Sequence, residues 1–259
     1  MHKVLSLILE SKKQRIEVLK KNREGLLSLI KKAPQPLSFK KAVNREGKIS
    51  LIAEIKQASP SAGILREDFS ALELAKLYQK LKVIAISVVT EEDFFLGKIN
   101  YIVDIKEKVG LPILRKDFIL DEIQILESRA VGADCVLLII SILTEEKLKS
   151  LYDFSKSLGM DVLAEVNTEK ELKKALALKA DIIGVNNRNL HTLQVKLDRS
   201  KQLAPFIPGG VTKISESGIN SFKDVLLLKG LGFNAILVGT AFMKADNIEE
   251  KIKELNIDI

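Results

Sequence analysis

The sequence has 259 residues, of which 46% are hydrophobic and 29% charged, with a formal net charge of +7 from 41 basic and 34 acidic residues. This balance is typical of a globular protein with an ample core, and it excludes disordered, collagen-like and disulfide-stapled chains. One cysteine and two histidines exclude an intramolecular disulfide and a Cys/His zinc cage, although not a metal held by carboxylates. The single cysteine favours the reducing cytoplasm as the compartment.

The basic excess is spread along the chain rather than clustered. Lys and Glu alternate throughout, aromatic residues make up 5%, and Trp is absent. This pattern favours solvated helix faces over a nucleic-acid surface, and an anionic substrate fits the excess equally well. No stretch approaches the roughly 20 apolar residues that span a bilayer. The apolar run at 4–9 is short for a signal-peptide core and is not followed by a small-residue cleavage site.

The first 48 residues differ from the rest and read as a helical extension. Apolar residues recur near helical spacing, with Lys and Arg between them. These residues are Leu5, Ile8, Leu9, Ile16 and Leu19. A second short helix is expected over 25–32, since Pro34 and Pro36 follow it and favour a helix stop.

From residue 51 onward, eight short apolar runs start 20 to 32 residues apart and alternate with amphipathic stretches such as 145–158. The expected strands are 51–56, 83–89, 111–116, 134–140, 161–166, 181–186, 211–216 and 234–238. Eight strand–helix units predict an α/β fold, a (β/α)8 TIM barrel over 49–259, in one domain with the extension. An open doubly wound sheet is the alternative, but it would usually carry G-x-G-x-x-G after its first strand, and none is present.

Charged or strongly polar residues end five of the eight expected strands. They are Glu54 and Lys56, Lys116, Glu165, Asn186 and Glu216. Alternation places Ile52, Leu114, Leu163 and Gly184 on the same inward face, one layer below. Charges inside a barrel cost several kcal/mol each unless paired or hydrated, and barrel enzymes keep their active sites at these strand ends. The set therefore predicts an active site.

Two loops indicate a phosphate-binding site. The segment S-E-S-G-I at 215–219 follows the seventh expected strand, and Gly239-Thr240 follows the eighth. Loops after these two strands commonly bind phosphate through backbone N–H groups that small residues leave accessible.

These residues resemble the indole-3-glycerol-phosphate synthase family of tryptophan biosynthesis, over essentially the whole chain and including a helical N-terminal extension. The motif E-x-K-x-x-S-P-S-x-G stands at 54–63. Further matching segments are S-V-V-T-E at 87–91, F-F-L-G at 94–97, P-I-L-R-K-D-F at 112–118, G-A-D at 132–134, E-V-N at 165–167, G-V-N-N-R at 184–188 and S-E-S-G-I at 215–219. The chain departs from the family at Lys98, Asn167 and Asn189, none of which is a charged group assigned to chemistry.

The resemblance implies a carboxy-lyase that closes the ring of 1-(2-carboxyphenylamino)-1-deoxyribulose 5-phosphate to give indole-3-glycerol phosphate, carbon dioxide and water. No redox step occurs and no electron sink is needed, so we expect neither cofactor nor metal. The expected partner is this small phosphorylated substrate, without nucleic acid or membrane. We expect a stand-alone monomer, with a weak dimer as the alternative.

Lys116 is the expected general acid toward the ketone oxygen, with a pKa lowered by burial and by neighbouring cations. Glu165 suits proton removal and the dehydration step. Glu54 and Lys56 are expected to pair. The resemblance implies that Lys56 also contacts the substrate, including its phosphate, and it is a second candidate for the acid role beside Lys116. Asn186 and Glu216 would orient the amine and hydroxyls of the substrate.

The remaining expected contacts divide among three parts of the substrate. Arg188 and Ser217 are assigned to the anthranilate carboxylate. The phosphate is assigned to Lys56, Ser59, Gly218, Gly239 and Thr240. Phe94, Phe95 and Phe118 either flank the aromatic ring or simply pack.

Three residues are not assigned to chemistry. Cys135 is expected to be a small buried hydrophobe, His191 to lie exposed in a loop, and Asp117 to point away from the site. The rival functions are phosphoribosylanthranilate isomerase, which needs a Cys/Asp pair at strand ends, a Schiff-base aldolase with a strand-end lysine, and a binding module for polyanions. Cys135 lies near the start of its expected strand, which argues against the isomerase.

Overall fold

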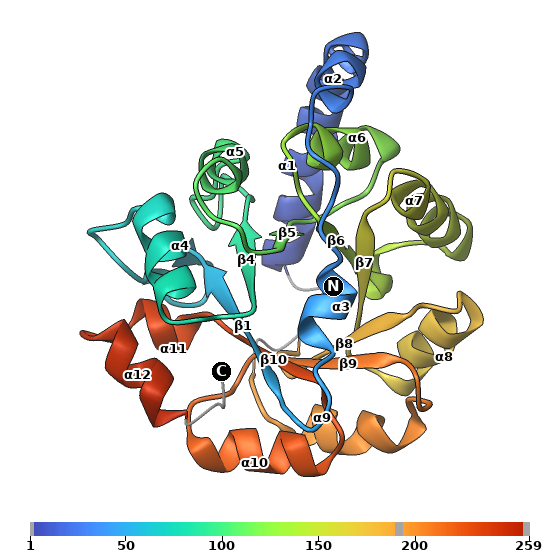
Figure 1. Cartoon of the computed structure of the whole chain (residues 1–259). Coiled ribbons are helices and arrows are strands. Elements are labelled where there is room, and N and C mark those ends of the chain that lie inside the picture. The colour runs from blue at the N-terminus through green and yellow to red at the C-terminus, as the bar shows by residue number, and fades with distance from the viewer. Residues whose placement is uncertain (1–2, 190–193, 256–259) are drawn as a thin grey trace.

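The computed structural model describes residues 3–189 and 194–255. Eight parallel strands close into a barrel in the order β1-β10-β9-β8-β7-β6-β5-β4 (Figure 1). The strands are β1 (Ser50–Ile55), β4 (Ala85–Val89), β5 (Ile113–Lys116), β6 (Cys135–Ile139), β7 (Asp161–Val166), β8 (Ile182–Asn186), β9 (Thr212–Glu216) and β10 (Ala235–Val238). Because β1 also pairs with β4 and closes the sheet, the barrel prediction is confirmed and the open-sheet alternative is wrong.

All eight predicted strands are present, with ends within two residues of the expected ones. Their residues are buried almost without exception. Parallel strands covered by helices are buried on both faces, so they read as continuous apolar runs rather than as alternating patterns. Short apolar runs at regular spacing were therefore sufficient to predict the strands.

Helices follow the strands and form the outer layer. They are α4 (Ala71–Lys80), α5 (Asn100–Lys106), α6 (Glu122–Ala130), α7 (Glu145–Ser157), α8 (Glu169–Ala177), α9 (Asp198–Leu203), α10 (Phe222–Gly230), α11 (Thr240–Met243) and α12 (Ile248–Glu254). Several begin at a polar cap: the side chains of Ser70, Thr144 and Thr168 each accept an N–H from the first turn of their helix. Such caps satisfy backbone donors that have no partner within the helix.

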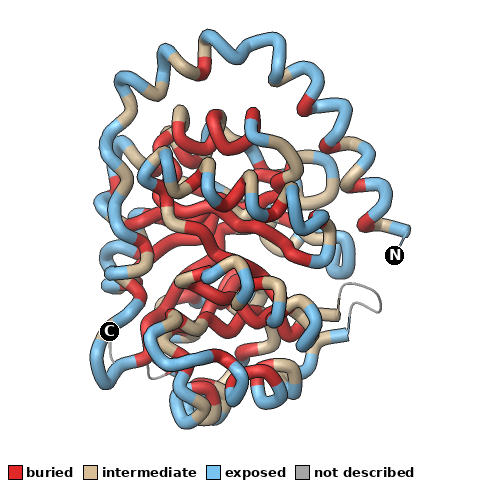
Figure 2. The backbone as a smooth tube through the Cα atoms, turned by 90° about the vertical axis from the view of Figure 1, so that its right-hand side faces the viewer, coloured by how far each residue is buried: buried red, intermediate tan, exposed pale blue. Residues whose placement is uncertain are grey.

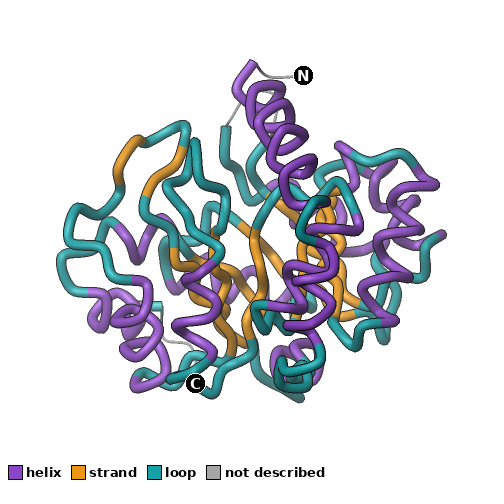
Figure 3. Tube along the Cα trace, turned by 90° about the horizontal axis from the view of Figure 1, so that it is seen from above, coloured by secondary structure: helices purple, strands orange, loops and turns teal. Residues whose placement is uncertain are grey.

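The interior of the barrel is layered. Ile52, Leu114 and Leu163 are fully buried in one interior cluster, while the charged residues of the strand ends lie above them. The alternation predicted for these three residues is confirmed. A small hairpin, β2 (Ala58–Ser59) and β3 (Gly63–Ile64), projects from the same end of the barrel at which α1 starts (Figure 3).

The N-terminal segment contains α1 (Lys3–Lys20) and α2 (Arg23–Ile30), as predicted, and a third helix, α3 (Phe39–Val43), that was not predicted separately. Figure 2 shows the first two helices arching over one side of the barrel, largely exposed. In contrast, α3 lies across the amino end of the barrel (Figure 1). Its Phe39 and Val43 are fully buried against the interior cluster, so α3 closes the barrel from below.

Aspartates at the starts of three strands hold this segment in place. The N–H of Leu37 donates to Asp134 at 2.7 Å, and the N–H of Lys40 donates to Asp161 at 2.9 Å. The Lys40 ammonium lies 3.4 Å from Asp181. A five-residue helix has too little periodicity to be seen in the sequence, and its anchors are about 100 residues or more away. Within the described residues, no helix is long and apolar enough to cross a membrane.

Candidate active site

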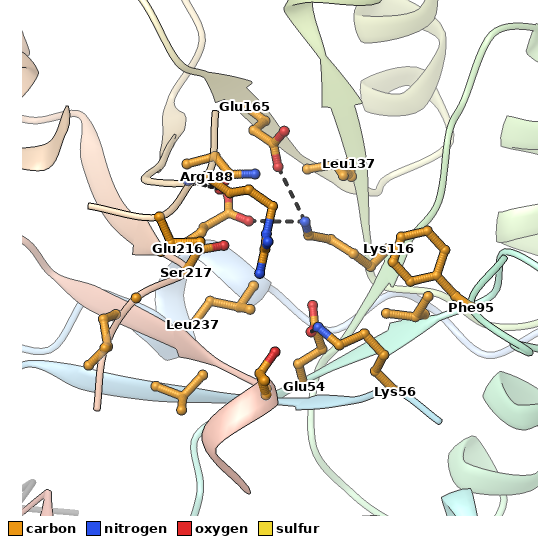
Figure 4. A pocket seen from close by; sticks show the side chains of 18 of the residues that line it. Glu54, Lys56, Phe95, Lys116, Leu137, Glu165, Arg188, Glu216, Ser217 and Leu237 are labelled. Carbon is orange, nitrogen blue, oxygen red and sulfur yellow. Dashed lines mark hydrogen bonds and ion pairs between the residues drawn. The ribbon is translucent and has the colours of Figure 1, made fainter. Parts of the chain in front are cut away.

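A cavity of about 300 Å³ opens at the carboxyl ends of the strands (Figure 4). Most of the predicted site residues line it: Glu54, Lys56, Phe95, Lys116, Phe118, Glu165, Asn186, Arg188, Glu216, Ser217, Gly218, Gly239 and Thr240. Two predicted residues do not line it. Ser59 is half-buried in the hairpin opposite Gly63, and Phe94 lies in the loop after β4 with its N–H bonded to Glu91.

Lys116 lies at the centre of the charged group. Its Nζ is 3.2 Å from Glu165 and 3.1 Å from Glu216, across the barrel on β7 and β9 (Figure 4). Glu54 and Lys56 form a second pair at 2.5 Å on β1 and just beyond it. Three carboxylates therefore share two lysines in a space where all five side chains are at most 17% exposed.

The expectation of a lowered pKa for Lys116 is wrong for this arrangement. Burial acts to lower the pKa, but the carboxylates of Glu216, Glu165 and Glu54 outweigh burial and raise it well above the usual lysine value. The sequence did not reveal that the nearest charges to Lys116 are anions from distant strands. An ammonium among carboxylates stays protonated at neutral pH.

Glu216 has the opposite balance. Burial raises the pKa of its carboxyl to about 7, with Lys116 opposing and the negative charges of Glu165 and Glu54 adding to the rise. No hydrogen-bond donor among the described residues reaches its Oε1. The carboxyl therefore titrates near neutral pH, and its Oε1 is buried in the space that Gly184 leaves.

Glu54 remains ionised. Burial acts to raise the pKa of its carboxyl, but Lys56 and Lys116 outweigh burial and lower it. The pKa values of Glu54 and Glu216 are thus shifted in opposite directions in one cavity. Groups whose environments push their pKa values apart are typical of acid–base sites.

Two glycines make room for these carboxylates. A Cβ added to Gly184 would lie 2.2 Å from Oε1 of Glu216, and one added to Gly239 would lie 2.3 Å from Oε1 of Glu54. Any larger residue would displace the carboxylate. Gly184 was predicted to face inward, and the space that it leaves is occupied by Glu216.

Apolar residues form one wall and the floor. The rings of Phe95 and Phe118 are tilted at 43° with centroids 6.3 Å apart, and we call this pair the aromatic wall. Leu137 and Leu237 line the floor. On the opposite side Arg188 is half-buried, and burial lowers the pKa of its guanidinium while Glu54 opposes the shift. The cavity can therefore hold an aromatic group with an anion near Arg188.

The loop after β9 has an unusual backbone. Ser217 and Gly218 are both left-handed, with φ of 69° and 82°. The side-chain amide of Asn187 donates to the carbonyls of Glu216 and Ser217, at 3.0 and 3.2 Å, and holds this loop. Successive backbone N–H groups in such turns form concavities that bind anions.

Sequence reasoning missed several lining residues, including Glu91, Leu137 and Val195. Glu91 is fully buried and accepts the N–H groups of Phe94 and Phe95 at 2.8 and 3.1 Å, so it shapes the loop that carries Phe95. A charged residue just beyond a strand was the signal used for the other sites. Applied to the loop after β4, this signal would also have identified Glu91 as a site residue.

The residues that were not assigned to chemistry behave as expected where they are described. Cys135 is buried among the apolar interior residues. Asp117 is among the residues that line the cavity, but its carboxylate is fully buried, accepts hydrogen bonds from Thr90 and Arg115 and pairs with Lys12. His191 lies outside the described residues.

Comparison with known proteins gives independent evidence on the family of this chain. A sequence model of the family described as indole-3-glycerol phosphate synthase matches residues 5–255. The chain is 47% identical over 257 residues to the indole-3-glycerol phosphate synthase of Thermoanaerobacter sp. (strain X514), covering 97% of this chain and 98% of that protein. It is 40% identical over 259 residues to that of Legionella pneumophila (strain Paris), covering 100% of each.

A similar solved structure is the N-acetylmannosamine-6-phosphate 2-epimerase from Clostridium perfringens, with a TM-score of 0.63 over 86% of this chain and 99% of that chain. At 16% identity, this likeness shows only the shared barrel. The relatives and the family match agree with each other and cover nearly the whole chain. On these grounds, this chain belongs to the indole-3-glycerol phosphate synthase family.

Proposed function

We propose that this chain closes the indole ring of 1-(2-carboxyphenylamino)-1-deoxyribulose 5-phosphate, and that Lys116 is the general acid of the first step. The observation that carries the proposal is the position of the Lys116 ammonium, buried between Glu165 and Glu216 beside an aromatic wall. The ring carbon that bears the carboxylate bonds to the ketone carbon. The ketone oxygen takes a proton, carbon dioxide leaves, and the new hydroxyl then leaves as water.

A lysine that is protonated at neutral pH suits the first step. The ketone oxygen becomes an alkoxide as the new bond forms, and an alkoxide is basic enough to take a proton from an ammonium of raised pKa. In a cavity with little water, a charge aimed at the developing oxyanion also lowers the barrier by electrostatic stabilisation. Glu216, with a pKa of about 7, is able to take up or return a proton beside Lys116 in each cycle.

The later steps need a base and a second acid. We assign proton removal before dehydration to Glu165, which faces Lys116 from β7. Lys56, paired with Glu54, is the second cation, which we assign to the phosphate and to the leaving hydroxyl. Asn186 ends β8, which lies between β7 and β9 in the barrel, and its side chain lines the cavity. It is assigned to the amine and hydroxyls of the substrate.

The binding groups divide along the cavity. The aromatic wall fits the anthranilate ring, and Arg188 with Ser217 fits its carboxylate. The left-handed turn at Gly218, together with Gly239 and Thr240, is suited to the phosphate. The proposed phosphate contact of Ser59 requires the β2–β3 hairpin to move inward, because Ser59 is not among the lining residues.

We also propose that the acting unit is one domain over 1–259, with an extension at 1–48 and a barrel at 49–259, working as a monomer. Light scattering at assay concentration tests the monomer against the alternative of a weak dimer.

The decisive experiment measures the fluorescence of the indole product from the purified protein and this substrate, for the parent and for Lys116→Met. We expect turnover in the parent and a loss of about 10³-fold or more in kcat for the variant. Lys108→Met, an exposed change after α5, serves as the matched control and is expected to behave as the parent. Turnover surviving in Lys116→Met would move the acid to Lys56, and a folded parent without turnover would refute the proposed reaction.

The rival functions are less well supported. A Schiff-base aldolase needs a neutral lysine, whereas the carboxylates around Lys116 keep it protonated. Borohydride with a ketose phosphate would label an aldolase and leave this protein unlabelled. The isomerase would need a cysteine at a strand's carboxyl end, whereas Cys135 is the first residue of β6.

A further inference from the structure

One lysine of α1 is buried rather than solvated. Lys12 is 3% exposed, whereas the side chain of Lys13 beside it is 69% exposed. The Lys12 ammonium lies 2.8 Å from Oδ1 of Asp117 and 3.0 Å from Oε2 of Glu92. A buried ammonium is unfavourable unless carboxylates compensate for the lost water. The two acidic partners come from different loops at the carboxyl end of the barrel, after β4 and β5.

Asp117 lies between two residues of the proposed site. It follows Lys116 and precedes Phe118, and it is among the residues that line the cavity, but its carboxylate is fully buried against Lys12. Its Oδ1 accepts the N–H of Phe118 at 2.8 Å and is the same oxygen that pairs with Lys12. Its Oδ2 accepts Thr90 at 2.7 Å. Lys12 is therefore a partner of the same carboxylate that accepts the Phe118 N–H and so fixes the backbone between Lys116 and Phe118.

The same turn of α1 also holds the loop that carries Phe95. Arg15 lies 2.6 Å from Asp93 and 3.4 Å from Glu92, and Ser11 donates a hydrogen bond to Asp93. We call Ser11, Lys12 and Arg15 the α1 clip. Of its three residues, only Lys12 touches both the loop after β4 and the end of β5.

The two segments held by the α1 clip meet again in the cavity. Phe95 comes from the first and Phe118 from the second, and together they form the aromatic wall. The last ladder contact between β4 and β5 is Val89 with Lys116, so beyond that point Lys12 bridges two loops that have left the sheet. We propose that Lys12 is a positioning residue for the aromatic wall, fixing its spacing from outside the cavity. This inference rests on the proposed function, since it gives the wall a substrate ring to hold.

The test compares Lys12→Met with Lys13→Met and with Lys12→Arg. Without the ammonium the two loops lose the bridge from α1 and keep the Thr90–Asp117 hydrogen bond between them, while Lys116 keeps Glu165 and Glu216. We therefore expect KM to rise about tenfold or more and kcat to fall less, since misplacement by about 1 Å away from the chemistry costs up to about 100-fold. Lys13→Met is expected to stay within about twofold of the parent, and Lys12→Arg to recover most of the loss. All assays are run well below the Tm of each variant.

A second control separates positioning from simple loss of helix packing. Ile16 lies on α1 and packs against Leu26, Ile123 and Leu126, outside the α1 clip. Ile16→Ala is expected to lower Tm while leaving KM within about threefold of the parent. An equal rise of KM in Ile16→Ala and Lys12→Met would overturn the proposal, and so would an unchanged KM in a folded Lys12→Met.

Amide hydrogen exchange gives a readout that does not require turnover. We expect faster exchange over 92–97 and 117–120 in Lys12→Met and parent-like exchange there in Lys13→Met. Parent-like exchange in Lys12→Met would refute the bridge. A parent without turnover would refute the proposed reaction, whereas the exchange result would still decide whether Lys12 holds the two segments together.

Discussion

Three carboxylates lie at strand ends on each side of the barrel, but their hydrogen-bond and ion-pair partners differ between the two sides. At the amino end, Asp134 accepts the N–H groups of Leu37 and Ile113 at 2.7 Å each and binds the Lys106 ammonium at 2.6 Å. At the carboxyl end, by contrast, Glu216 has an ion pair with Lys116 and no hydrogen-bond donor on Oε1 among the described residues.

This difference shows what turns a strand-end carboxylate into a structural anchor or a reactive group. Where the segment that contains α3 covers the barrel, its backbone N–H groups donate to Asp134 and Asp161, and lysines pair with all three aspartates of this end. Where the end stays open, the carboxylates compete for two lysines, and the pKa of Glu216 rises to about 7 as a result of burial and of its acidic neighbours. At the open end a buried carboxylate oxygen thus stays without a hydrogen-bond donor among the described residues.

After Lys116→Met, the largest loss of activity is expected from a substitution that fills the space beside a carboxylate at the open end. In Gly184→Ala the new methyl group would lie 2.2 Å from Glu216 and 3.0 Å from Leu163, so Glu216 must leave its present position beside Lys116. We expect kcat/KM to fall about 100-fold, measured by product fluorescence. Gly230→Ala has nothing within 4 Å of its new methyl group and is the matched control. Parent-like activity in Gly184→Ala would mean that the position of Glu216 is not critical.

The next effect acts on the closed end and on stability. Asp134→Asn removes the compensating charge from Lys106 and weakens the link between the segment before α3 and the barrel, at a fully buried site. We expect a loss of about 3 kcal/mol in unfolding free energy with little change in kcat, measured by urea denaturation and by assay at low temperature.

The matched control for this change is Asp153→Asn, which removes only an exposed pair with Lys149 on α7. Its expected cost is below about 0.5 kcal/mol. A large drop in kcat for Asp134→Asn, measured at a temperature at which the variant is folded, would contradict the separation of the two ends.

The smallest expected effect is a pH dependence of stability from Glu216. Its pKa is raised in the folded protein from 4.5 to about 7, so its carboxyl binds more protons when folded than when unfolded. The stabilising contribution is therefore fully present below about pH 4.5 and is lost as the pH rises through about 7. We expect Tm to fall between pH 5 and pH 8 by a few degrees more in the parent than in Glu216→Gln. Identical pH profiles for the two proteins would refute the raised pKa.

Much of this molecule was predictable because its signals are local. Strand runs and their spacing predicted the barrel, and the alternation of side chains along each strand predicted that Glu54, Lys116, Glu165 and Glu216 face one cavity. These features depend on the period of a single strand, which is two residues wherever the strand lies. They needed no knowledge of neighbouring strands.

Other features were decided only by the closed barrel. The pKa of Lys116 moved opposite to the expectation, because barrel closure brings Glu165 and Glu216 from β7 and β9 to its ammonium. The burial of Lys12 and the packing of α3 under the barrel likewise depend on partners that are at least 80 residues away along the chain. A single sequence reveals which groups point inward, since that follows from local backbone geometry. Which charges then meet, and hence their protonation, is set by strand order and register, which only the tertiary structure determines.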